Sequence, residues 1–316
     1  MINFVIRRIV LMLATLLCVS ILVFLLAQLL PGDIGRAILG RFASSSQVHQ
    51  LDAQLGMYKP MPERYLDWIG GFLTGHWGDS LLLDVPILPL VFARLWNSVQ
   101  LGAVAMVIIF PLSVFMGVLA GLRENGFVDK SISTLGLGLT ALPEFVSGII
   151  LLVLFGVTLR VFPVTAQAPP GSSIPEHIYY LILPAIPLMF VLFGYLAKHA
   201  RDGTREVVES NYYRTAVLKG LPRHRLIYRH VLPNALLPTI TVMAVQVGYL
   251  IGGLVVIESL FNYPGIGLLL LNSAVGKDLP VLMDTTVVLG AIIVLSNALA
   301  DISYSLLNPR IRLAVR

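Results

Sequence analysis

Six apolar stretches, each about as long as a bilayer crossing, constrain this chain more than any other feature of its sequence. They cover residues 9–30, 98–121, 133–159, 179–197, 235–257 and 282–305. A helix needs about 20 apolar residues to cross the hydrocarbon core. Only 12% of the residues are charged, against roughly a quarter in soluble domains. The pattern therefore predicts an all-α polytopic membrane protein with six transmembrane helices and both ends on one side.

The first stretch follows Arg7 and Arg8, as the core of a secretory signal would. It is longer than a usual signal core, and no small-x-small cleavage site is evident after it. We therefore expect a retained helix, in which Cys18 serves packing.

The basic residues predict the orientation of the helices. With the N-terminus inside, 15 of the 22 Lys and Arg residues lie on the inner side, and eight of these fall within 198–232. Five of the seven outer ones lie in a single long segment, and the short outer loops are nearly free of Lys and Arg. Because cytoplasmic loops carry the excess of Lys and Arg, both termini are expected to be cytoplasmic.

Two hydrophilic segments divide the chain. We expect residues 1–30 to form an N-terminal cytoplasmic tip and the first helix, and 31–97 an extracytoplasmic insertion between helices 1 and 2. Residues 98–307 then form the transmembrane core, which contains an inward segment at 198–234, and 308–316 form a cytoplasmic tail.

A short helix is predicted within the inward segment. Asn211 can cap a helix over residues 212–219, and Gly220 followed by Leu221-Pro222 ends it, with Gly220 in the left-handed conformation. Eight residues form only a marginal helix in isolation, so something must hold it. Two alternatives remain at this point, a protein partner or the lipid headgroups that attract basic amphipathic helices.

Three common motifs of nucleotide-hydrolysing and proteolytic sites are absent from the sequence. The sequence has no G-x-x-x-x-G-K-[ST] phosphate loop, no H-E-x-x-H and no G-x-S-x-G, so no nucleotide-hydrolysing or proteolytic site is expected.

Charges inside membranes are usually functional or paired. Asp284 and Asp301 are expected at the interface, whereas Glu144 either faces a substrate path or satisfies a bond freed by Pro143. An ion-coupled secondary transporter using Glu144 or Asp301 is therefore an alternative, and an intramembrane enzyme lacks a nucleophile and base.

Several motifs along the chain share the pattern of a known family. Arg214-Thr215-Ala216, Lys219-Gly220 and the run Arg229–Pro238 resemble the "EAA" loop in the peptide branch of the binding-protein-dependent ABC permeases. Further matching stretches are Leu30-Pro31-Gly32-Asp33, Glu258 with Phe261 and Pro264–Gly267, and Asn297, Asp301, Tyr304 and Asn308–Ile311. They run from the first helix to the last in the family's order.

The resemblance implies a fold, partners and site residues. The fold would be that of a type I ABC importer permease in the bacterial inner membrane. Its partners would be a second similar permease, two ATP-binding cassette subunits and an extracytoplasmic solute-binding protein, and no nucleic acid. ATP and Mg would bind those cassette subunits, with no cofactor and no metal in this chain. Residues coupling to the ATPase would be Tyr213, Arg214, Thr215, Ala216, Lys219, Gly220, His230 and Pro233, with the small Ala216 allowing close approach of the ATPase surface.

The resemblance leaves the translocation pathway and the substrate less defined. Glu144 and Gln246 are the candidate pathway residues. Leu55–Pro60, Gly75–Ser80 and Glu144 depart from the family's pattern. The substrate class, whether dipeptide, oligopeptide, glutathione, nickel chelate or sugar, therefore stays open.

Overall fold

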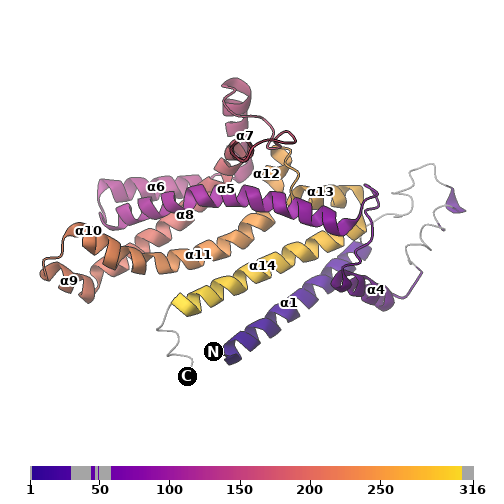
Figure 1. Cartoon of the computed structure of the whole chain (residues 1–316), viewed down its shortest axis with the longest axis horizontal. Coiled ribbons are helices and arrows are strands. Elements are labelled where there is room, and N and C mark those ends of the chain that lie inside the picture. The colour runs from indigo at the N-terminus through magenta and orange to yellow at the C-terminus, as the bar shows by residue number, and fades with distance from the viewer. Residues whose placement is uncertain (1, 30–43, 47–48, 50–57, 308–316) are drawn as a thin grey trace. The chain divides into compact units, whose positions relative to one another are not determined.

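The computed structural model of the chain describes residues 2–29, 44–46, 49 and 58–307, and within these it is helical (Figure 1). The main elements are α1 (Ile2–Leu29), α4 (Met61–Thr74), α5 (Ile87–Gly121), α6 (Phe127–Ala141), α7 (Glu144–Leu151), the π-helix η1 (Leu152–Thr158), α8 (Ile174–Glu209), α9 (Asn211–Leu218), α10 (Arg223–Leu226), the π-helix η2 (Ile227–Val231), α11 (Leu232–Gly253), α12 (Val255–Leu260), α13 (Ile266–Gly276) and α14 (Leu279–Leu307).

Six membrane crossings are confirmed when each bent helix pair counts as one span. Four helices are long and apolar enough to cross a bilayer, at Ile6–Leu29, Ile87–Gly121, Ile174–Glu209 and Leu279–Asp301. The other two crossings are Phe127–Ala141 with Glu144–Thr158, bent by 95°, and Arg223–Leu236 with Thr239–Gly252, bent by 44°. The expected single helix over 133–159 is therefore broken. Leu142 is extended, at φ −77° and ψ 122°, because the following Pro143 disfavours the helical conformation.

Two other helix boundaries differ from the hydrophobic pattern. α5 begins at Ile87, well before the apolar window at 98, and α8 continues through Glu209, past the window's end at 197. The extension of α8 is polar but helix-forming. Arg205 Nε lies 3.0 Å from Glu209 Oε1, one turn along the helix, and this ion pair stabilises the extension. Most of the inward segment 198–234 is thus helical.

The chain divides into two compact units. The first comprises Val99–Tyr263 with the segment from Leu295, and α8 is its central helix, packing against α6, α7 and α11. Small residues allow the close approach. A Cβ on Gly117 or Gly121 of α5 would collide with α8 at Ala197 and Thr204, respectively, and Gly136 of α6 lies against Gly194 of α8. Small residues at such positions let the backbones of membrane helices approach closely.

The second unit comprises Ile2–Ser98 with Pro264–Val294. Asp278, which precedes α14, accepts hydrogen bonds from Ser80 Oγ at 2.5 Å and from the Leu82 backbone N–H at 3.3 Å. Asp284 is buried within the protein and accepts a hydrogen bond from Trp68 Nε1 at 2.8 Å, and its expected place at the membrane interface stays a prediction. Cys18 is exposed on α1 rather than packed in a core of this unit.

Several sequence expectations lie outside the described residues. These are the Leu30–Asp33 motif, most of the Leu55–Pro60 segment, the Asn308–Ile311 motif, the tail 308–316 and much of the insertion 31–97.

Candidate functional site

The short helix α9 has the predicted form, shifted by one residue at its start. Ser210, and not Asn211, is its N-cap, since the Ser210 Oγ accepts a hydrogen bond from the Tyr213 N–H at 3.4 Å. Asn211 is the first helical residue. Gly220 follows the helix with φ +73°, which confirms the left-handed conformation expected there. A side chain would be strained at this position although nothing lies within 4 Å of an added Cβ.

One face of α9 is held against its own unit. Tyr213 packs beside a cluster formed by Val207 of α8, Val231 of η2 and Ala235 of α11. Ala216 points the same way and is only 5% exposed. The expectation that Ala216 receives the ATPase surface is therefore wrong, because its side chain is occupied by contacts within this chain.

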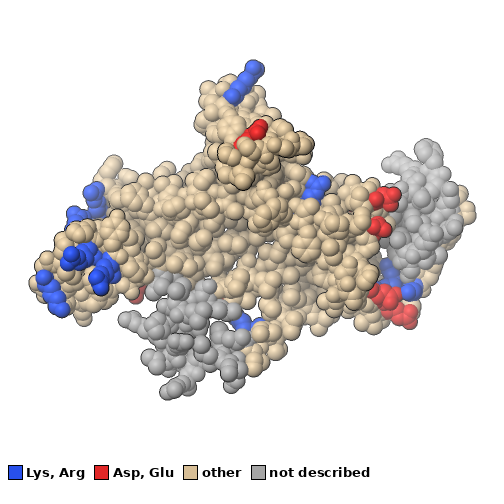
Figure 2. All heavy atoms as spheres, in the orientation of Figure 1, with Lys and Arg blue, Asp and Glu red and all other residues tan. Residues whose placement is uncertain are grey.

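The opposite face of α9 is uncovered. Leu218 is 87% exposed, and Tyr212, Arg214, Val217 and Lys219 are exposed beside it. Figure 2 shows basic side chains gathered over α9 and α10, at the end of the unit. Leu218, Val217 and Tyr212 are exposed large apolar side chains on one short helix, and such a group rimmed by basic residues favours an interaction surface.

Two other sequence-predicted residues lie outside α9. His230 belongs to η2, next to the buried Val231, and its backbone oxygen accepts a hydrogen bond from Asn234 Nδ2 at 2.8 Å. Pro233 stands in the first turn of α11, which directly follows η2. Neither residue therefore lies on the exposed face of α9. Thr215 is exposed, with its hydroxyl bonded to the Asn211 oxygen at 2.9 Å.

An ion pair that the sequence reasoning missed joins α8 to α6. Arg201 holds Asp129 through two hydrogen bonds, Nε to Oδ1 at 2.5 Å and a terminal guanidinium nitrogen to Oδ2 at 2.8 Å. Asp129 also accepts from the Asn125 backbone N–H at 2.9 Å and is buried. Bidentate geometry fixes orientation as well as distance. The available signal was an acidic residue just before the apolar stretch 133–159, on the same predicted side of the membrane as the basic segment 198–232.

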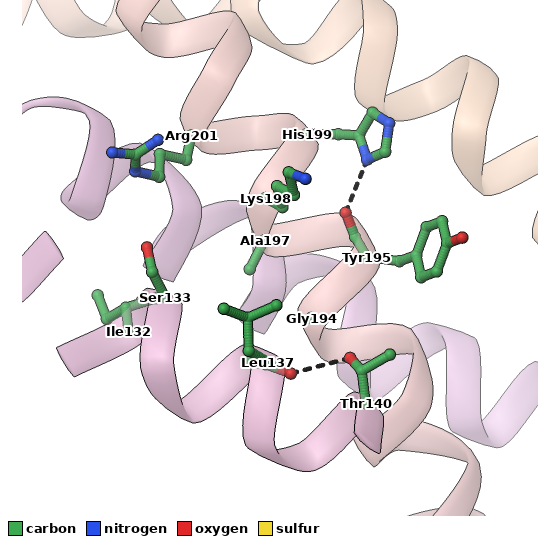
Figure 3. Close-up of a pocket in the computed structure, with 11 residues that line it drawn as sticks. Ile132, Ser133, Leu137, Thr140, Gly194, Tyr195, Ala197, Lys198, His199 and Arg201 are labelled. Carbon is green, nitrogen blue, oxygen red and sulfur yellow. Dashed lines mark hydrogen bonds between the residues drawn. The ribbon is translucent and has the colours of Figure 1, made fainter. Parts of the chain in front are cut away.

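A cavity of about 490 Å³ lies beside this ion pair, between α6 and α8. Figure 3 shows Ser133, Leu137 and Thr140 of α6 facing Tyr195 and Lys198 of α8 across it. His199 Nδ1 lies 2.8 Å from the Tyr195 backbone oxygen, and the Thr140 hydroxyl is bonded to the Gly136 oxygen at 2.8 Å. The His199 ring and the Thr140 hydroxyl are therefore engaged by their own helices.

One candidate pathway residue, Glu144, is bonded to α11 through Tyr249, which sequence reasoning did not identify. Glu144, the first residue of α7, accepts a hydrogen bond from the Tyr249 hydroxyl of α11 at 3.1 Å. Gln246 lies one turn before Tyr249 and shares its helix face. Glu144 and Gln246 are each partly buried. Among the described residues, no group of three or more His, Cys, Asp or Glu could hold a metal ion.

Comparison with known proteins covers nearly the whole chain. The family described as "Binding-protein-dependent transport system inner membrane component" matches residues 113–313, and its N-terminal counterpart matches residues 1–116. A probable peptide ABC transporter permease protein of Sinorhizobium fredii is 34% identical, covering 98% of this chain and 99% of the relative. An oligopeptide transport system permease protein of Bacillus subtilis is also 34% identical, covering 98% of both chains.

Proposed function

We propose that this chain, which belongs to the family of binding-protein-dependent transport system inner membrane components, forms half of the translocation pathway of an ATP-driven peptide importer. Membership makes it a membrane-embedded permease subunit of an ABC importer and not the ATPase subunit. It works with ABC partners and a binding protein. The ion-coupled alternative built on Glu144 or Asp301 is not supported by these relatives.

We also propose which subunits join this chain in the complex and where the complex lies. The pathway is completed by a second, similar permease, and two cassette subunits bind ATP and Mg, while this chain binds neither nucleotide nor cofactor. The complex lies in the bacterial inner membrane with both termini of this chain in the cytoplasm. The distribution of basic residues supports that orientation. The names of the relatives support peptides as the substrate class.

The observation that carries the coupling role is the two-sided character of α9. Its inner face is fixed by Tyr213 and Ala216, so the helix moves with α8 and α11 as one body. Its outer face presents Leu218 with Arg214 and Val217, a mixed apolar and basic surface fit for a protein cleft. We infer that an ATPase subunit receives this face, whereas a helix resting on lipid headgroups would turn its apolar side chains toward the membrane.

Motion of α9 then reaches the membrane through α8. α8 continues without a break from the membrane to Glu209, one residue before the cap of α9. The bidentate pair of Arg201 with Asp129 carries its displacement to the start of α6. ATP-driven closure of the cassette subunits thus tilts α8 and α6 together and opens the translocation pathway on its extracytoplasmic side.

The pathway itself is proposed to pass Glu144. Its carboxylate is partly buried and held by Tyr249, and Gln246 offers amide groups on the same face of α11. A carboxylate and an amide can pair with the amino terminus and the backbone of a peptide.

Truncation of the outer face of α9 tests the coupling role. Leu218→Ala in the assembled complex is expected to lower binding-protein-stimulated ATPase activity and uptake by at least about tenfold, as loss of an interface anchor does. Phe127→Ala is the matched control, because Phe127 is 86% exposed in the same unit but lies on α6. Wild-type coupling in Leu218→Ala, or an equal loss in Phe127→Ala, would reject docking through α9.

A further inference from the structure

α4 is an amphipathic helix with two different apolar strips. At 100° per residue, Tyr65, Trp68 and Phe72 fall on one strip, and Leu66, Ile69 and Leu73 fall on the strip beside it. Glu63, Asp67 and Gly70 lie on the polar side. Lys59 Nζ lies 2.6 Å from Asp67 Oδ2, and both side chains are well exposed, which indicates that the polar side faces water.

The aromatic strip fastens α4 to two membrane-spanning helices of its own unit. The Tyr65 hydroxyl and Ser20 Oγ of α1 are 2.8 Å apart. The Phe24 ring of α1 lies with its centroid 5.5 Å from that of Tyr65 and 6.0 Å from that of Trp68. Trp68 Nε1 donates to Asp284 of α14 at 2.8 Å. Four aromatic and polar contacts therefore fix the depth of α4.

That depth lies inside the bilayer. Ser20 stands nine residues before Leu29, the last residue of the first span, which is about 13 Å along a helix. Leu22, Leu25 and Leu26, in the stretch of α1 between them, are exposed, as expected of a surface that faces lipid. A helix bonded to Ser20 therefore lies at the level of the acyl chains and headgroups, because the hydrocarbon core is about 30 Å thick.

The second strip of α4 continues this lipid-facing surface. Leu66 is 64% exposed and Leu73 is 77% exposed. We propose that α4 is an interfacial helix, with its Leu66–Ile69–Leu73 strip inserted among phospholipid acyl chains at the Leu29 end of α1 and its Glu63–Asp67–Gly70 side in water. The segment expected to project into the extracytoplasmic space is thus partly a membrane anchor. This inference does not depend on the coupling role or on the substrate.

Fluorescence quenching in vesicles tests this placement. Single cysteines at Leu66→Cys and Leu73→Cys, with Glu63→Cys and Gly70→Cys as matched controls, would be made in the Cys18→Ala background and labelled with the environment-sensitive dye NBD. Gly70 tolerates a side chain, since nothing lies within 4 Å of an added Cβ. The complete transporter without its binding protein would be placed in phosphatidylcholine–phosphatidylglycerol vesicles containing nitroxide-labelled acyl chains, with iodide available on both faces.

Labels at 66 and 73 are expected to be quenched by the acyl-chain nitroxide and to be at least about threefold less sensitive to iodide than those at 63 and 70, because the strip is buried in lipid. Equal iodide quenching at all four positions would place the strip in water and overturn the proposal. Protection of 66 and 73 that arises only after the binding protein is added would identify a protein as the occupant, and would overturn it equally.

Discussion

Ala216 and Gly220 are two small residues, four positions apart, whose surroundings differ completely. Ala216 is buried against its own unit, whereas a Cβ on Gly220 would meet nothing within 4 Å. A bulky residue at 216 therefore acts by overpacking the support of α9. At 220 the backbone conformation and any added charge decide the outcome.

Substitution of Gly220 separates backbone strain from charge. Gly220→Ala and Gly220→Asp both place a side chain at φ +73°, which costs about 1–2 kcal/mol. Only the Asp variant adds a negative charge beside the outer face of α9. We expect Gly220→Asp to abolish uptake in the reconstituted complex while Gly220→Ala retains most of it, at similar expression. A loss of uptake at least as large in Gly220→Ala would assign the residue to helix termination alone.

The ion pair of Asp129 with Arg201 is a second residue-level test. The Asp129 side chain is 4% exposed and that of Arg201 is 22% exposed. Asp129→Asn leaves the guanidinium without its main partner and should cost about 3–5 kcal/mol, as for a broken buried pair. Asp67→Asn breaks the exposed pair with Lys59 and should change stability little, because water screens an exposed ion pair.

Thermal unfolding in detergent measures both effects. The double variant Asp129→Asn/Arg201→Gln should be more stable than Asp129→Asn, because it removes the uncompensated charge. Equal midpoints for Asp129→Asn and Asp67→Asn would show that the Asp129 pair does not hold α6 to α8.

At the element scale, hydrophobicity predicted the crossings but not their ends or bends. Residues 198–209 are polar, so a search for apolar windows ends α8 near 197 although its sequence is still helix-forming. The bend after α6 was hidden because the stretch 133–159 is mostly apolar both before Pro143 and after Glu144. α13, with 11 residues, is too short to register as a crossing. A search for apolar windows detects segments that lie in lipid, whereas the ends of a helix depend on the local backbone conformation and on capping.

Close contact between α6 and α8 gives an element-level prediction. A Cβ on Gly194 would collide with the Thr140 hydroxyl and lie 2.5 Å from the Gly136 oxygen, whereas one on Gly138 would meet nothing within 4 Å. Gly194→Ala should therefore destabilise the protein by about 1–3 kcal/mol through overpacking. Gly138→Ala should be neutral or stabilising by up to about 1 kcal/mol. The midpoints of thermal unfolding compare them, and an unchanged midpoint for Gly194→Ala would refute the close approach.

At the scale of the whole molecule, the motifs predicted the family, and they indicated α9 as the region proposed to couple to the ATPase. They did not predict which side of α9 is exposed, because the direction of a side chain depends on what packs beneath the helix, here Val207, Val231 and Ala235. Tyr249 was missed for a related reason. Its link to Glu144 joins residues 105 positions apart, and a single sequence gives no sign of such a pairing.

The last prediction concerns the orientation of the whole chain in the membrane. In a Cys18→Ala background, Glu63→Cys should react with a membrane-impermeant maleimide added to intact spheroplasts, and Tyr228→Cys should react only after lysis. Both positions are exposed, so accessibility within the protein does not limit either reaction. The expectation rests on 15 of 22 basic residues lying on the proposed inner side, where positive charge is retained. Glu63 stands on the water-facing side of α4, so lipid burial of Leu66 and Leu73 does not protect it. Labelling of Tyr228→Cys in intact spheroplasts, with Glu63→Cys protected, would invert the topology and put α9 on the side where no ATPase could meet it.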